Sequence, residues 1–217
     1  FEQAADAFGE VLDLYGAGRV DERIRLDDDA EALLVHTLAR AGGAEAFAAH
    51  FDRVGPRPYE LRLLRAMGQH FRRYTLFGPA VASDQLLLDR HPLVPEALEA
   101  AQRMDETYRR WQRPAERRAA LLANAVRFEP GSAWIAAQVT DSLRACGDAF
   151  ARAATLEVAW QHHGAGREGG RADDWREAAR LAYETRVQEQ ADLHREMIVE
   201  MNEAASAAGL RGLRPED

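Results

Sequence analysis

Apolar side chains recur along most of this chain at the three- and four-residue spacing of amphipathic helices. The first stripe contains Phe1, Ala4, Phe8 and Val11, and it ends near Gly16. Asp27, Asp28 and Asp29 then supply an N-cap and carboxylates that favour the start of a second helix. Further stripes predict helices over 32–41, 44–54, 94–111, 114–128, 133–145 and 148–160, with a helix pair inside 59–91. The pattern therefore predicts an all-α protein.

The pattern changes after Trp160. Residues 161–171 hold four glycines, which predicts a loop. A long helix is expected over 172–208, with Asp173 as its cap, and a loose tail over 209–217. This helix carries an apolar stripe (Val187, Ala191, His194, Ile198, Met201, Ala205). The stripe serves either to cap the preceding helices or to form a homodimer with a second copy of the chain.

One stretch organises the middle of the chain. Leu64, Met67 and Phe71 lie on one helix face, and Gly68 between them allows a second helix to approach closely. Ala80 is the expected small contact on that second helix, and Pro92 ends it. This spacing is typical of antiparallel helix pairs that stack on one another.

These residues resemble the tetratricopeptide repeat (TPR) family, with one departure: Asp84 stands where the family prefers an aromatic residue. The resemblance covers about residues 1–160. The predicted turns inside successive repeats fall at Gly43, Thr75, Gln112 and Gly147, at intervals of 32, 37 and 35 residues. The resemblance implies a right-handed superhelix of antiparallel helix pairs, closed by the long C-terminal helix. Because the first stripe is typical of the second helix of a repeat, we expect the chain to start mid-repeat, as part of a longer protein.

Charge is unevenly distributed in this acidic chain, which has 36 acids, 28 basic residues and a net charge of −8. Residues 1–56 have 12 acids and 5 Arg, residues 57–127 have 8 acids and 13 Arg, and residues 128–217 have 16 acids and 10 Arg. In TPR arrays the first helices of the repeats line a groove that binds peptides. The resemblance thus implies a partner-binding site for a protein or an acidic peptide at Arg65, Arg72, Arg73, Arg103, Arg109 and Arg110. The alternative is that these arginines pair with acids of neighbouring repeats.

The function that the resemblance implies is a non-enzymatic scaffold without a cofactor, which binds a peptide segment or a partner subunit. Leu88-Asp-Arg-His-Pro92 also resembles repeats of bacterial envelope lipoproteins in assembly or motility complexes. The net negative charge argues against a nucleic-acid partner. No apolar run is long enough to span a membrane, and the single Cys146 leaves the bacterial cytoplasm and the periplasm both open.

The competing class is a helical-bundle enzyme or signalling protein with a metal or phosphohistidine site. His36 lies in a weak phosphotransfer pattern, and Arg65 and His70 match the loose Arg-x4-His spacing of helical nucleases. His162 and His163 in the glycine-rich segment, and the acids around His194, are weak metal candidates. Each of these residues also fits an ordinary place on a repeat helix or a surface loop.

Overall fold

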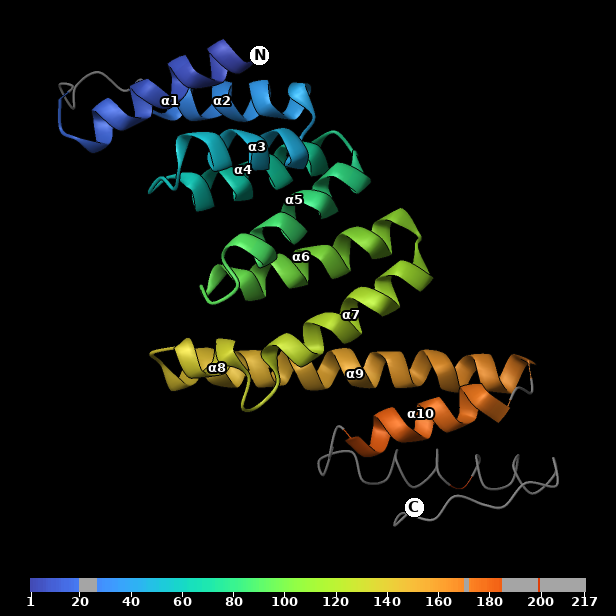
Figure 1. Cartoon of the computed structure of the whole chain (residues 1–217). Helices are drawn as coiled ribbons and strands as arrows, with labels where there is room; N and C mark the ends of the chain where they lie inside the picture. The colour runs from blue at the N-terminus through green and yellow to red at the C-terminus, as the bar shows by residue number, and fades with distance from the viewer. Residues whose placement is uncertain (20–26, 170–171, 185–198, 200–217) are drawn as a thin grey trace. The chain divides into compact units, whose positions relative to one another are not determined.

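The computed structural model of the protein describes residues 1–19, 27–169, 172–184 and 199. It divides into two compact units, Phe1–Arg117 (unit 1) and Arg118–Asp217 (unit 2). Every regular element in these ranges is an α-helix and none is a strand, which confirms the all-α prediction (Figure 1). The right-handed superhelix of helix pairs remains a prediction.

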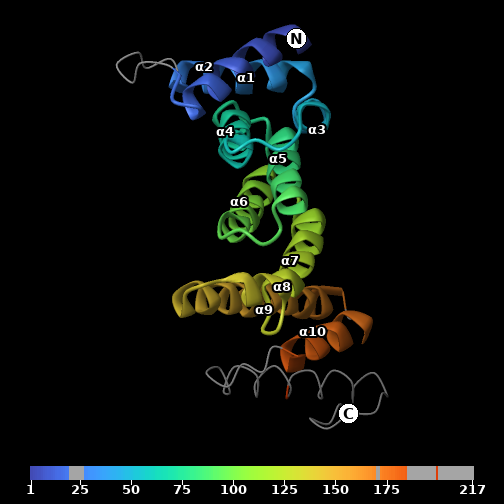
Figure 2. The ribbon, with the colours of Figure 1, turned by 60° about the vertical axis from the view of Figure 1, so that its left-hand side comes forward.

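Unit 1 consists of six helices and the first turn of a seventh. They are α1 (Glu2–Gly16), α2 (Asp27–Ala41), α3 (Ala44–Val54), α4 (Glu60–Arg73), α5 (Phe77–Arg90), α6 (Glu96–Trp111) and α7 (Pro114–Phe128). Helix α1 packs on α2, α2 on α3 and α4, α3 on α5, and α5 on both α4 and α6 (Figures 1 and 2). The bounds of α3 and α7 match the predicted ranges.

The core of unit 1 is built from the predicted apolar stripes. Leu64, Met67, Phe71 and Ala80 are all buried. The atoms nearest to a Cβ at Gly68 belong to Arg72 and Asp84. A Cβ at Gly68 would lie 3.4 Å from Oδ1 of Asp84 and 3.3 Å from Nη2 of Arg72, so the space beside this glycine is filled by a carboxylate and a guanidinium group.

Two turns in unit 1 share one geometry. Thr75 and Gln112 each have a φ of 57°, and they are the non-glycine residues with positive φ in the described ranges. In the first turn the Leu76 amide donates to the Phe71 carbonyl at 2.9 Å, and in the second the Arg113 amide donates to the Tyr108 carbonyl at 3.1 Å. Both turns therefore satisfy the last carbonyls of a helix with the six-to-one bond of a Schellman motif. Both lie at the predicted turn positions.

Unit 2 contains the rest of α7, then α8 (Ala133–Ala137), α9 (Asp141–Gly169) and α10 (Ala172–Glu184). Helix α8 is capped by Ser132, whose hydroxyl accepts from the Ile135 amide. Helices α9 and α10 form a hairpin, and α8 packs on α9. Trp134 is the largest buried side chain, and its ring lies edge-on to Phe128 at 5.0 Å.

Two predictions for this region are wrong. Gly147, where a turn was expected, and residues 161–169 of the expected loop 161–171 lie within α9, which continues unbroken to Gly169. The glycines have packing roles instead: a Cβ at Gly147 would lie 2.5 Å from Cζ3 of Trp134, and a Cβ at Gly166 would lie 2.9 Å from Nε1 of Trp175. Each glycine thus lets a tryptophan ring pack directly on the backbone of α9.

In the region of the predicted C-terminal helix, α10 starts at Ala172, so Asp173, which was expected to be the cap, lies in the first turn of the helix. The apolar stripe from Val187 to Ala205 and the tail 209–217 lie outside the described residues. The capping and homodimer hypotheses for this helix therefore stay predictions.

Candidate partner-binding site

Three of the six predicted site arginines form a charged ladder across α4, α5 and α6. Arg72 of α4 donates to Asp84 of α5 at 2.5 Å, and Arg103 of α6 donates to the same carboxylate at 3.0 Å. Glu99 of α6 then accepts from Arg65 of α4 at 2.9 Å. The ladder connects α4 and α6, which are not neighbours in the chain, both directly and through Asp84 of α5.

The centre of the ladder is buried. Asp84 is 1% exposed, although a lone buried carboxylate is strongly unfavourable. Burial raises the pKa of the Asp84 carboxyl above its ordinary value, and the guanidinium groups of Arg103 and Arg72 oppose this rise. Arg72 and Arg103 therefore stabilise the Asp84 carboxylate, and through it both arginines contribute to the stability of the fold.

The other three predicted arginines lie at the C-terminal ends of α4 and α6, and all three are exposed. Arg109 pairs with acids of its own helix, Asp105 at 2.8 Å and Glu106 at 3.2 Å. Arg110 lies over the ring of Phe77, with Cζ 5.6 Å from the ring centroid. In the described part of the chain, neither Arg73 nor Arg110 has a carboxylate within ion-pair distance. The six arginines therefore divide into an internal group and an outward-facing group.

Aromatic rings accompany the outward-facing group. Trp111 of α6 lies 6.5 Å from Phe77 of α5 and stacks on Tyr108 at 6.2 Å, between centroids. Arg113 covers the Trp111 ring at 5.0 Å. A Cβ at Gly78 would lie 3.4 Å from Cη2 of Trp111, an ordinary van der Waals contact, so the indole lies close to the first turn of α5. We call Phe77, Tyr108, Trp111, Arg110 and Arg113 the aromatic–arginine surface.

The edge of this surface is apolar. Tyr74 and Leu76, in the turn that precedes Phe77, are 59% and 48% exposed. The apolar stripes alone do not predict this surface, because it lies at the turns, where the stripes end. The available signal was the repeated proximity of aromatic residues and arginine on both sides of the two turn positions, Thr75 and Gln112.

A second charged cluster connects α1 with α3 and the start of α4. Arg53 donates to Asp6 at 2.6 Å, and the Tyr59 hydroxyl donates to the Gly9 carbonyl at 3.3 Å. His50 is buried beside them, with Nδ1 3.7 Å from Asp6. Burial lowers the pKa of His50, against the opposing effect of Asp6, and burial with the nearby charge of Asp13 raises the pKa of Tyr59 to about 12. These groups surround a pocket of about 190 Å³.

The structure gives the neighbours of four histidines that the sequence offered as candidate site residues. The rings of His36 and His70 lie 5.8 Å apart on α2 and α4, whereas Arg65 bonds to α6. His162 and His163 lie on α9 rather than in a loop. Nδ1 of His162 is 3.2 Å from Oδ1 of Asp174, and the His163 ring packs between Trp160 and Trp175. The predicted setting of these two histidines was wrong because the helix continues through their glycine neighbours.

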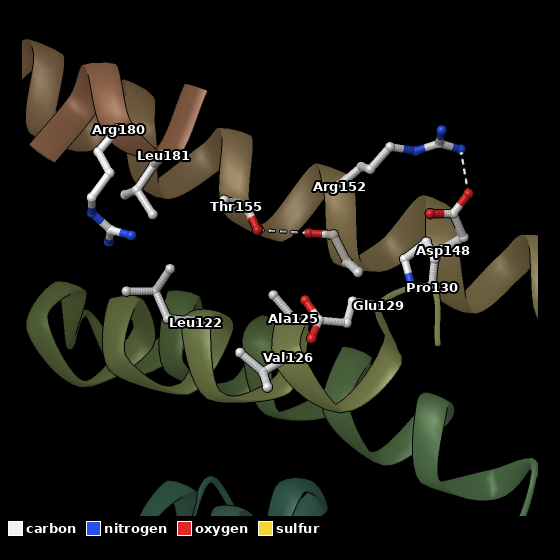
Figure 3. Close-up of a pocket in the computed structure, with 11 residues that line it drawn as sticks. Leu122, Ala125, Val126, Glu129, Pro130, Asp148, Arg152, Thr155, Arg180 and Leu181 are labelled. Atoms are coloured by element: carbon white, nitrogen blue, oxygen red, sulfur yellow. Dashed lines mark hydrogen bonds and ion pairs between the residues drawn. The ribbon is translucent and has the colours of Figure 1, made fainter. Parts of the chain in front are cut away.

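Unit 2 contains a larger pocket, of about 460 Å³, between α7, α9 and α10 (Figure 3). Leu122, Ala125 and Leu181 give it apolar walls. Of its charged residues, Arg152 pairs with Asp148 at 2.9 Å and Arg180 with Glu177 at 2.6 Å. This pocket was not predictable from the sequence pattern, which divides α9 into two helices.

Within the described ranges, no group of three or more His, Cys, Asp or Glu side chains is placed to hold a metal ion. No helix in those ranges has the length and apolar character needed to span a membrane. Comparison of the chain with models of protein families, with curated proteins and with solved structures finds no match.

Proposed function

We propose that this protein is a non-enzymatic scaffold that binds a segment of another protein. One observation supports the proposal: the aromatic–arginine surface combines exposed arginine with partly exposed tryptophan, tyrosine and phenylalanine. Tryptophan, tyrosine and arginine are the residues most enriched at the energetic centres of protein interfaces. The tyrosine and tryptophan rings provide contact area with little loss of side-chain entropy.

The stacked helices of unit 1 give this surface a rigid support. Phe77 begins α5 and Trp111 ends α6, and these two helices pack on each other. Farther from the turns, the ion pairs of Asp84 on α5 also hold these two helices together, through Arg103 on α6. A preorganised surface loses less entropy when a partner binds, which favours affinity.

The test is site-specific photo-crosslinking in cells that produce the protein naturally. A crosslinker replaces Leu76, at the edge of the surface, or Val139 in unit 2, which is 90% exposed and serves as the matched control position. We expect one discrete protein adduct from position 76, its absence from position 139, and its loss when Arg110→Glu is added. Identical adducts from both positions, or none from position 76, would contradict the proposal.

A further inference from the structure

We infer that the aromatic–arginine surface binds a short acidic peptide segment that carries an aromatic or large aliphatic side chain. This inference rests on the proposed scaffold function and adds the chemistry of the partner. Three features of the structure support it: the orientation of Arg110, the local excess of positive charge, and the backbone of the two flanking turns.

The first feature is the way in which Arg110 is held. Its guanidinium group lies over the Phe77 ring, so one of its faces is used in a cation–π contact. The N–H donors of a guanidinium group lie in its plane, and they therefore stay available to a carboxylate. A carboxylate that binds edge-on would make a charge-assisted, bidentate pair next to an apolar ring.

The second feature is charge. Near the two turns, Arg109 pairs with Asp105 and Glu106, and Arg113 pairs with Glu116. Among the described residues, Arg73 and Arg110 have no carboxylate within ion-pair distance. Asp105 is shared, since Arg117 donates to it at 2.6 Å and Arg109 at 2.8 Å. The local surplus is positive in a chain whose net charge is −8. Complementarity therefore favours a partner segment that is acidic at this point.

The same charges favour a peptide over a nucleic acid. Aromatic rings and arginine also bind single-stranded nucleic acids, but that binding rests on phosphate contacts along a basic groove. Here Glu106 and Glu116 lie within 3.3 Å of the arginines and would face the phosphates. A short segment with one apolar side chain can use the edge formed by Tyr74 and Leu76, where a polyanion gains little.

The third feature is backbone strain. Thr75 and Gln112 adopt the left-handed conformation in the turns on both sides of the surface, and β-branched threonine rarely does so. Glycine would fit both positions without strain. In each turn the left-handed residue belongs to the Schellman motif that ends the helix. Phe77 then starts α5 two residues after Thr75, and Arg113 directly follows Gln112.

The experiment uses the full chain, immobilised and exposed to a library of short random peptides at low and at high salt. We expect the enriched peptides to contain Asp or Glu next to Phe, Tyr, Trp or Leu, with affinities that fall as salt rises. Arg110→Glu should weaken the best peptide by about tenfold or more, and Arg113→Ala by about threefold. Arg176→Ala is the matched control, because Arg176 is similarly exposed and also forms an i,i+3 ion pair, with Asp173. It should leave affinity unchanged.

Other outcomes would overturn the inference. These are enrichment of peptides without acids, binding that Arg110→Glu does not weaken, or tighter binding of a single-stranded oligonucleotide than of the best peptide. Circular dichroism of each variant confirms that it is folded. If crosslinking at position 76 finds a partner while the library shows no acidic preference, the scaffold function stands and the partner chemistry is wrong. If both fail, the proposed function fails with it.

Discussion

Replacing Gly147 with alanine should destabilise the protein, although alanine is the better helix former. A Cβ at this position would lie 2.5 Å from Cζ3 of Trp134 and 3.1 Å from Cδ1 of Ile135. The indole cannot move aside easily, because it is 1% exposed and its ring meets Phe128 edge-on. Gly164→Ala is the matched control on the same helix, since nothing lies within 4 Å of its added methyl group.

The magnitude follows from two opposing effects. An unstrained glycine-to-alanine change within a helix stabilises it by about 0.5–1 kcal/mol. Carbon atoms in contact normally lie about 3.5–4.0 Å apart, so the Gly147 methyl must push the indole by about 1 Å. Overpacking of this kind costs about 1–3 kcal/mol. We therefore expect Gly164→Ala to gain up to about 1 kcal/mol, and Gly147→Ala to lose up to about 2 kcal/mol.

The assay is urea unfolding followed by circular dichroism, which gives the free energy of unfolding of each variant. A double-mutant cycle tests whether Trp134 is responsible for the loss. Because Trp134→Phe makes the ring smaller, Gly147→Ala should lower the free energy of unfolding by less in that background. If both glycine variants gain stability equally, or if Trp134→Phe leaves the cost of Gly147→Ala unchanged, the contact between α8 and α9 is not as described.

Three further predictions concern unit 1. Asp84→Ala should destabilise it by about 3–5 kcal/mol, because Arg72 and Arg103 lose their shared carboxylate, while Asp89→Ala on the same helix should have little effect in the same urea assay. Thr75→Gly should raise stability by about 1 kcal/mol by relieving the left-handed backbone, measured as a higher melting temperature. Burial lowers the pKa of His50, so the unfolded chain binds the proton more readily, and stability should fall as pH falls below about 6.5. His50→Gln should flatten that dependence in melting curves taken between pH 7 and pH 5.

Most helices of unit 1 were predictable because they carry a regular apolar stripe and have glycine or proline near their ends. Helix α3 is an example, since Gly43 precedes it and Gly55 and Pro56 follow it. Unit 2 was predicted less well, because glycine has two roles that look identical in a sequence. At Gly55 it takes a positive φ and ends a helix, whereas at Gly147 and Gly166 it lies within α9 and makes room for a tryptophan. Only the position of the facing ring distinguishes these roles.

The site was predicted in part, for an electrostatic reason. The sequence indicates an excess of arginine over 57–127, but it does not show which arginines meet a carboxylate from another part of the chain. Arg62 pairs with Glu31, Arg57 with Asp13 at 3.2 Å and Arg90 with Asp52 at 2.6 Å, and all three acids come from the acidic segment 1–56. Within unit 1, arginines of the basic middle of the chain therefore form ion pairs with acids of its acidic beginning. Of the six predicted site arginines, Arg65 and Arg103 pair with acids of a neighbouring predicted repeat, as in the alternative, whereas Arg72 and Arg109 pair with acids of their own predicted repeat.

Because most arginines of unit 1 are in ion pairs, an exposed arginine without one is a stronger candidate for binding a partner. An arginine in a surface ion pair contributes little to binding, because a partner must compete with the carboxylate already present. Arg72 and Arg103 are further committed by the burial of Asp84. Arg110 is held by a ring rather than by a carboxylate of the described chain, so it keeps its in-plane donors while its position is fixed. A fixed cation with unused donors beside partly exposed aromatic rings is favourable for recognition of an acidic segment, and for this reason Arg110 is the residue on which the partner-binding proposal depends most.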